Sequence, residues 1–260
     1  MASGATSWRG RLERAVGTTL IEKVPRDHTQ SDAEFRRRRI VVGIVLFAGA
    51  TLLGVSLEVQ PGDATFYPLT LGVAAIWVIG GFLSGPLHLG YLPFRGTLRR
   101  PVVTGLAFGV LAGVIFLFGA LLVRLVPPLH DYVENLLAHA RYGSLPLIVL
   151  VTVANGVAEE VFFRGALYAA AGRDRPVVAS TAVYVLATTA TRNPSLVLAS
   201  GVMGVLFGLQ RRATGGIQAP LITHLTWSVL MLRFLPPLFR RPQEPDLSPP
   251  PPGAAPRRTT

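Results

Sequence analysis

The sequence predicts an all-α membrane protein, a polytopic bundle of about seven to eight transmembrane helices with a four-helix core near its C-terminal end. Half of the 260 residues are hydrophobic and only 15% are charged, whereas a soluble domain carries about a quarter. The charges sit in short clusters between long apolar runs. These runs approach the roughly 20 residues that a helix needs to cross about 30 Å of hydrocarbon.

Seven apolar runs are candidate spans, and the fifth and sixth are short enough to be tilted or broken. A polar stretch at 130–142 predicts a helix at the membrane interface, and no strand pattern is evident. The spacing of Gly105, Gly109 and Gly113 favours close packing of the third span against a neighbour. The runs are Ile40–Leu57, Phe66–Leu83, Val102–Val123, Leu145–Ala170, Pro176–Ala190, Leu196–Leu209 and Ile217–Leu235.

These runs divide the chain into four parts. Residues 1–39 form a basic N-terminal arm, and 40–144 hold the first transmembrane helices and the interfacial helix. Residues 145–236 form the four-helix core. Residues 237–260 are rich in proline and predict a disordered tail.

Charge predicts the orientation of the protein. The net charge is +11, which in a soluble domain would suggest nucleic acid. Here the basic residues flank apolar runs, so we expect no nucleic acid partner and assign them to membrane topology. Clusters at 36–39, 95–100, 173–175 and 211–212 fall on one side. This predicts an integral protein of the plasma membrane with a cytosolic N-terminus, although Arg240 and Arg241 fall on the opposite side.

The fourth span contains two adjacent carboxylates, Glu159 and Glu160. An ionisable side chain within a span costs about 2.5–3.5 kcal/mol on insertion scales and usually marks a functional site. Arg164 follows Glu160 by four residues, the spacing of a helical ion pair. Asn155 lies one turn before Glu159. We therefore expect a structural Glu160–Arg164 pair and a working Glu159; the alternative is a buried ion pair of all three charges that only specifies helix packing.

The seventh span contains the second polar cluster, in which His224 and Ser228 share a helix face. A single histidine here could simply bond a neighbouring helix. Counting residues at 1.5 Å each places Glu159 roughly 9 Å, and His224 roughly 10 Å, from the cytosolic surface. At one level, a carboxylate and an imidazole can share and activate a water molecule, with or without a metal ion.

The motif EExxxR at 159–164, followed by His224 in APLITHLTWS at 219–228, resembles the CPBP (CAAX-processing and bacteriocin-processing, or Abi) family of intramembrane metalloproteases. The resemblance covers roughly 145–236 and implies that this is a four-helix catalytic core. It implies that Glu159 activates water, that Glu160 and Arg164 support it, and that His224 is the second catalytic or ligand residue.

Two positions depart from the family pattern. The middle motif FxxxH corresponds here to Tyr184 through Thr188, with threonine in place of histidine, and Ser228 replaces the asparagine of HxxxN. A zinc site would need His224 with Glu159, Glu160 and water, an unusual ligand set. Zinc or another divalent metal could be the cofactor, held by Glu159 and His224. The pattern favours a metal-independent or weakly metal-dependent site, or a core without activity.

The leading functional hypothesis is therefore an intramembrane endopeptidase that cleaves a peptide or membrane-protein substrate near the cytosolic face of the bilayer. Asn155, Thr188 and Ser228 would support the catalytic residues. The alternatives are a catalytically silent scaffold or immunity-type protein of the same fold and, third, a transporter. Intramembrane carboxylates also carry ions, but the chain shows no internal repeat of the kind many transporters have.

Overall fold

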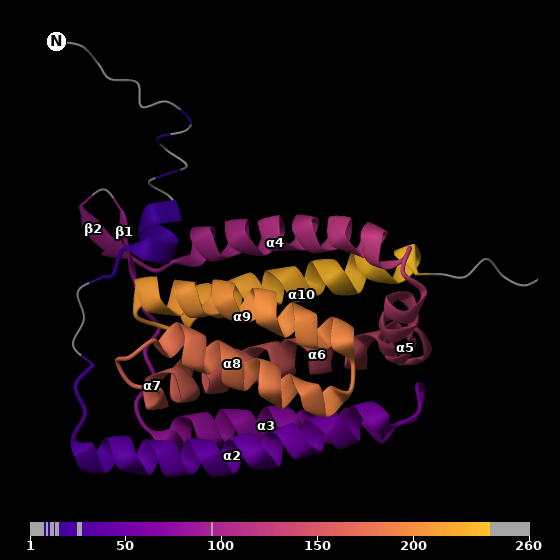
Figure 1. Ribbon diagram of the computed structural model, residues 1–260, viewed down its shortest axis with the longest axis horizontal. Helices are drawn as coiled ribbons and strands as arrows, with labels where there is room; N and C mark the ends of the chain where they lie inside the picture. The colour runs from indigo at the N-terminus through magenta and orange to yellow at the C-terminus, as the bar shows by residue number, and fades with distance from the viewer. Residues whose placement is uncertain are drawn as a thin grey trace, which may run out of the picture.

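The computed structural model describes residues 8, 10, 13, 16–24, 28–94 and 96–239. Most of its long helices lie side by side along one direction (Figure 1). Within the described residues the α-helices are α2 (Asp32–Glu58), α3 (Phe66–Ser84), α4 (Val102–Val123), α5 (Pro127–Tyr142), α6 (Leu145–Glu159), α7 (Tyr168–Ala170), α8 (Pro176–Thr188), α9 (Pro194–Thr214) and α10 (Gln218–Leu238). Short turns of π- and 3-10 helix are η1 (Gly17–Ile21), η2 (Glu160–Leu167) and η3 (Thr189–Thr191).

Within the part of the chain that the structure describes, six helical segments are long and apolar enough to cross a membrane, which confirms the predicted helical membrane bundle. The predicted count of seven to eight spans was too high. The fifth run, Pro176–Ala190, forms the 13-residue helix α8 and then 3-10 helix. Thirteen residues rise only about 20 Å, less than the hydrocarbon thickness. The sixth run is longer than predicted, because α9 extends it at both ends.

The first long helix begins before its apolar run. Ser31 caps α2: its hydroxyl oxygen accepts from the backbone N–H of Glu34, and the Glu34 carboxylate accepts from the backbone N–H of Ser31. This reciprocal capping box satisfies two amides that a helix start would otherwise leave unpaired. As a result, Arg36 to Arg39 belong to α2 and extend the helix beyond its apolar part.

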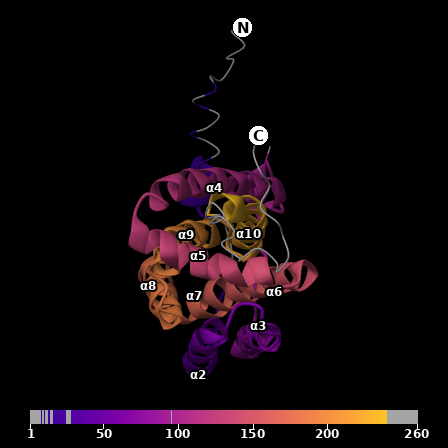
Figure 2. The same cartoon turned by 90° about the vertical axis from the view of Figure 1, so that its right-hand side faces the viewer.

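Two further elements lie outside the parallel bundle. The polar stretch predicted at 130–142 is helical, and α5 lies across one end of the bundle (Figure 2). The expectation of no strands was wrong. Strands β1 (Leu92–Phe94) and β2 (Thr97–Arg99) form an antiparallel hairpin. It turns through Gly96, whose φ of +78° suits glycine. Runs of three residues are too short to give an alternating pattern.

The helices form layers around α6. Helices α2 and α3 pack together on one side, α8 and α9 pack together and contact η2, and α4 covers α10 (Figures 1 and 2). The largest buried cluster joins α2 and α3 to the α6–α7 segment through Trp77, Phe162 and Phe163. The segment that carries both glutamates is therefore enclosed on several sides.

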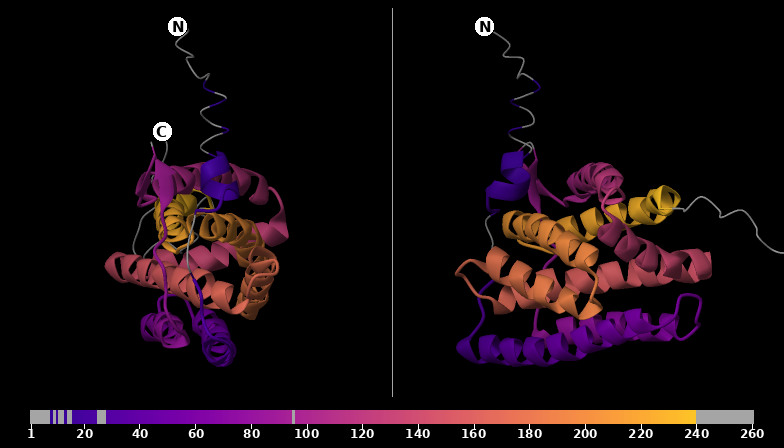
Figure 3. Two further views of the ribbon diagram at one scale, coloured as in Figure 1. Left: turned by 90° about the vertical axis from the view of Figure 1, so that its left-hand side faces the viewer. Right: turned by 45° about the vertical axis from the view of Figure 1, so that its right-hand side comes forward.

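One end of the bundle, called the basic end below, gathers the arginine clusters. Figure 3 (left) looks onto this end, where α2, α4, α8 and α10 begin and α3, α7 and α9 finish. Its arginines belong to Arg36–Arg39, Arg99–Arg100, Arg173–Arg175 and Arg211–Arg212. The predicted tail lies outside the described residues from residue 240 onward, as does Arg95.

Candidate functional site

The two adjacent glutamates lie where one helical type gives way to another. Glu159 is the last residue of α6, and Glu160 is the first of the π-helical segment η2, which continues into α7. All eight residues of η2 are buried. π-Helical turns are rare and often occur at functional sites. The change of winding falls at the motif that the sequence singled out.

Glu160 is the centre of a buried ionic network. Its side chain is 0% exposed, and its Oε1 accepts from Arg164 Nη1 at 3.1 Å. The predicted Glu160–Arg164 ion pair is thus confirmed. Arg164 also lies between two aromatic rings, with its guanidinium carbon 4.5 Å from the Tyr184 centroid and 4.8 Å from that of Phe207. These rings fix the guanidinium in addition to its charge partner.

His224 joins this network rather than pairing with Glu159. Its Nδ1 lies 2.8 Å from the same Oε1 of Glu160. A carboxylate at Nδ1 favours the tautomer with its proton there, which leaves Nε2 as an acceptor. The sequence-based expectation that His224 faces the first carboxylate therefore needs correction: Glu160 orients the imidazole. Residue spacing could not choose between adjacent carboxylates on different helix faces.

Glu159 faces a cavity of about 140 Å³ that His224 also lines. The two residues therefore reach one cavity, as their depths predicted. The hydroxyl of Tyr184 donates a hydrogen bond to Glu159 Oε2 at 2.6 Å. The rest of the wall is mainly apolar and comes from α2, α3, η2, α8, η3 and α9, with one residue from α10: Leu53, Leu57, Trp77, Phe163, Ala187, Thr191, Leu196, Ala199, Ser200, Met203, Phe207 and Trp227.

Tyr184 is the site residue that the sequence reasoning missed. It stands at the phenylalanine position of the FxxxH pattern, and its hydroxyl is the only chemical difference from phenylalanine. Four residues later, Thr188 also lines the cavity, and its hydroxyl donates to the Tyr184 carbonyl oxygen at 2.8 Å. A tyrosine in place of phenylalanine, one turn before a missing histidine, was the available signal.

The other two predicted supporting residues lie elsewhere. Asn155 Nδ2 donates to the Val151 carbonyl oxygen of its own helix at 2.9 Å. Ser228 is buried on α10. Neither residue is among those that line the cavity, so Thr188 is the supporting residue that the fold brings beside Glu159.

Glycines allow the helices that carry the site to approach. A Cβ at Gly156 on α6 would lie 3.0 Å from Leu225 Cδ2 and 4.0 Å from the His224 ring. On α4, a Cβ at Gly109 would lie 2.9 Å from the Thr223 carbonyl oxygen, next to His224. The predicted close packing of the third span is confirmed, and it presses α10 toward α6.

The side chains of the site do not by themselves form a metal centre. In the part of the chain that the structure describes, the group of three that brings its ligand atoms within 4.8 Å is His130, Asp131 and Glu134, on α5. Glu159, Glu160 and His224 do not converge in this way, since His224 Nδ1 is already bound to Glu160. A structural zinc site needs four ligands, and a catalytic one usually has three from the protein. The donor set fits a metal poorly.

Comparison with known proteins gives one match. Residues 141–230 match the family described as Type II CAAX prenyl endopeptidase Rce1-like. The matched range begins at the end of α5 and runs into α10, so it includes the ionic network and Tyr184. No curated protein and no solved structure is similar enough to count as a match.

Proposed function

Because residues 141–230 form an Rce1-like (CPBP) family domain, we propose that this membrane protein is an intramembrane endopeptidase. It would hydrolyse a peptide bond of a peptide or membrane-protein substrate near the cytosolic face of the bilayer. The observation that carries the proposal is the shared cavity: Glu159 and His224 line it together, and Glu160 and Arg164 hold His224 from behind.

In the proposed reaction a water molecule lies between Glu159 and Nε2 of His224. Glu159 takes a proton from the water as its oxygen attacks the scissile carbonyl carbon. The carbon–nitrogen bond then breaks, and Glu159 returns the proton to the leaving amine. Glu160 fixes the imidazole in the way that a carboxylate orients histidine in hydrolase triads, and Tyr184 holds the Glu159 carboxylate toward the cavity.

No step of this mechanism passes through a metal, since the donor set fits one poorly. The related proposal that zinc or another divalent ion binds Glu159 and His224 can be tested directly by measuring the metal content of the purified protein. Stoichiometric zinc in the wild type that is lost in both Glu159→Ala and His224→Ala would replace the metal-free mechanism. We expect no such zinc, and a rate that chelators leave unchanged.

The alternative of a catalytically silent scaffold depends on the replaced histidine at Thr188. In a silent protein the polar residues would have no reason to surround a cavity. Here Thr188, Tyr184 and Glu159 border the same 140 Å³ space, which is large enough for several water molecules. This supports an active site over a scaffold, and nothing in the described residues favours a transporter.

The test uses full-length protein in proteoliposomes with a fluorogenic peptide that ends in a CAAX sequence, in farnesylated and unmodified forms. We expect the wild type to cleave at least one form. Glu159→Gln should lower the rate by roughly 100-fold or more, because it removes the general base. Glu58→Gln is the matched control, because Glu58 is exposed, pairs with Arg192 and does not line the cavity.

Three results would count against the proposal. One is a Glu159→Gln variant that cleaves at the wild-type rate, which would remove the base from the mechanism. Another is equal loss in Glu58→Gln, which would reduce the effect to general damage. Binding of both peptides without cleavage would favour the silent scaffold.

A further inference from the structure

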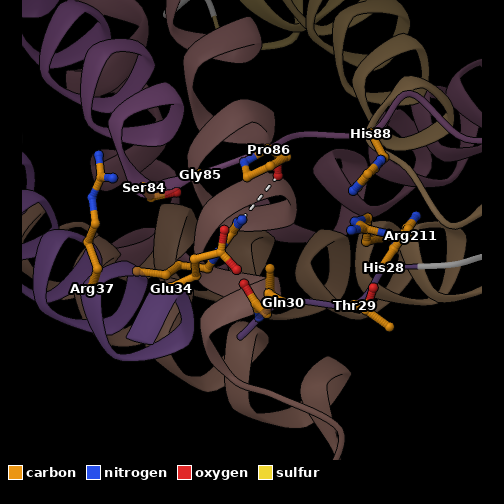
Figure 4. Close-up of a pocket in the computed structure, with 12 residues that line it drawn as sticks. His28, Thr29, Gln30, Glu34, Arg37, Ser84, Gly85, Pro86, His88 and Arg211 are labelled. Atoms are coloured by element: carbon orange, nitrogen blue, oxygen red, sulfur yellow. Dashed lines mark hydrogen bonds between the residues drawn. The ribbon is translucent and has the colours of Figure 1, made fainter. Parts of the chain in front are cut away.

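A second cavity, of about 150 Å³, lies at the basic end, away from Glu159 and His224 (Figure 4). It is enclosed by the start of α2, the segment after α3, the helix α7 and the last turn of α9. The residues at 28–30 cover it from the side that leads to η1. Its wall contains three arginines and two histidines: Arg37, Arg38, Arg211, His28 and His88.

Arg38 is buried in this wall with much of its bonding capacity unused. Arg38 is only 4% exposed. Its Nη2 donates to the Pro86 carbonyl oxygen at 3.2 Å. Its Nε and Nη1 are buried and have no hydrogen-bond partner. Gly85 makes room for this guanidinium, because a Cβ there would lie 2.5 Å from Nη2. Buried charged donors without partners are costly, so an acceptor is expected in the adjoining space.

Two further arginines around the cavity increase its positive potential, and two histidines line it. Arg211 is 4% exposed and lines the cavity while its Nε donates to the Arg164 carbonyl oxygen at 2.7 Å. His28 and His88 stack with their centroids 3.8 Å apart. Arg37 lies at the rim, where its Nη2 donates to the Leu83 carbonyl oxygen.

Among the described residues that line the cavity, one carboxylate opposes these groups. Glu34 lines it, and its Oε2 already accepts from the Ser31 amide and hydroxyl. Partial burial lowers the pKa of His88, and the charges of Arg211 and Arg38 lower it further. The part of this lowering that comes from Arg211 and Arg38 reflects the positive charge gathered around the cavity.

We propose that this cavity binds a phosphate group, with the guanidinium of Arg38 as its main donor and Arg211 and His88 completing the contacts. A phosphate group carries several acceptor oxygens, and the unused Nε and Nη1 of Arg38 are two separate donors that such a group can satisfy with charge-assisted hydrogen bonds. A volume of 150 Å³ is equivalent to several water molecules, enough for one phosphate group.

The position of the cavity favours a lipid headgroup as the source of this phosphate. It lies where the membrane helices begin and end, at the end that carries the arginine clusters. Basic pockets between transmembrane helices on the cytoplasmic side are typical sites for anionic headgroups. A free phosphate ion offers the same oxygens, so the experiment must separate the two.

The experiment compares three proteins, wild type, Arg38→Gln and Arg36→Gln. The two variants lose the same charge two residues apart on α2, but Arg36 is exposed and outside the cavity wall. Each protein is purified in detergent, and its thermal midpoint is followed in titrations with short-chain phosphatidic acid and, separately, with inorganic phosphate. Native mass spectrometry after extraction from phosphatidic acid vesicles measures lipid retention.

We expect phosphatidic acid to bind wild type and Arg36→Gln alike, and Arg38→Gln about tenfold or more weakly. Inorganic phosphate that shifts the midpoint as strongly, again only with Arg38 present, would keep the site and assign it to the free ion. Equal binding by Arg38→Gln and Arg36→Gln would overturn the proposal, since attraction would then follow net charge. If Arg38→Gln does not fold, Arg38→Lys takes its place in the experiment. Lysine keeps the positive charge but lacks the several donors of the guanidinium, so unchanged binding would contradict the proposal.

Discussion

The contact between Tyr184 and Glu159 gives this carboxylate a polar partner on α8. The FxxxH pattern supplies a histidine at the position of Thr188, one helical turn further along α8 than the aromatic residue. In this chain the polar contact to Glu159 comes from the aromatic position itself, through a 2.6 Å hydrogen bond. We therefore assign to Tyr184 the task of holding Glu159.

Tyr184→Phe should lower kcat by roughly tenfold or more, because a hydrogen bond to a charged group contributes about 1.5–3 kcal/mol. The ring contacts with Phe163 and Arg164 remain, so KM should stay close to wild type. Tyr142→Phe, at an exposed position on α5, is the control. A kcat equal to that of wild type would show that the hydroxyl does not position Glu159 for the reaction.

At the residue scale, local pairs were predictable and tertiary pairs were not. The Glu160–Arg164 pair follows from a spacing of four residues on one helix. The Glu160–His224 contact joins residues 64 positions apart, and its choice of carboxylate depends on the rotation of α10 about its axis. The Tyr184 contact depends similarly on where α8 lies.

At the scale of elements, the packing of α4 against α10 is the contact that most directly affects the site. Gly105, Gly109 and Gly113 all face α10, and a Cβ at any of them would lie within 2.8 Å of an α10 side chain. The glycine spacing predicted this interface, since small residues four apart let helices approach. The spacing did not identify α10 as the partner helix, because any neighbouring helix could have packed against these glycines.

Gly109→Ala should push α10 away and disturb His224 through the adjacent Thr223. We expect overpacking of about 1–3 kcal/mol, seen as a lower thermal midpoint together with a lower cleavage rate. Gly119→Ala on the same helix meets nothing within 4 Å and should leave both values near wild type. Equal effects of the two variants would mean that helix propensity, not packing, governs this position.

The prediction of too many spans has a physical explanation at the same scale. Helix α8 is apolar, but it is partly covered by its neighbours and packs along α9 (Figure 1). An apolar run reports that a segment avoids water, and burial against protein satisfies this as well as lipid does. Length was the better guide, and α8 has only 13 residues.

At the scale of the whole molecule, the arginine clusters and the candidate site distinguish the two ends of the bundle. The clusters converge on one end, and the positive-inside rule predicts that this end lies in the cytosol. Residues that line the cavity beside Glu159 extend toward the opposite end, where Leu57, Thr191 and Leu196 lie near helix termini. In the proposed reaction, the depth at which a peptide would be cleaved and the side from which it would enter the cavity are therefore set by different parts of the bundle.

The orientation can be measured directly because the chain contains no cysteine. Gln60→Cys lies in the loop between α2 and α3, and Asp174→Cys lies in the loop between α7 and α8 at the basic end; both positions are exposed. In intact cells a membrane-impermeant maleimide should label the cysteine at position 60, and the one at 174 only after permeabilisation. The reverse pattern would place the N-terminus outside.

The π-helical segment from Glu160 to Leu167 limits how this chain can change in length. Its hydrogen bonds span five residues instead of four, so it holds an extra residue compared with an α-helix of the same course. Deleting one residue there would let the segment rewind as α-helix, and the side chains on either side of the cut would then turn by about 100° relative to each other. Residues beyond the cut would face different neighbours from those before it, while the apolar content stayed the same. Related chains can therefore exchange side chains around this segment more readily than they can gain or lose a residue within it.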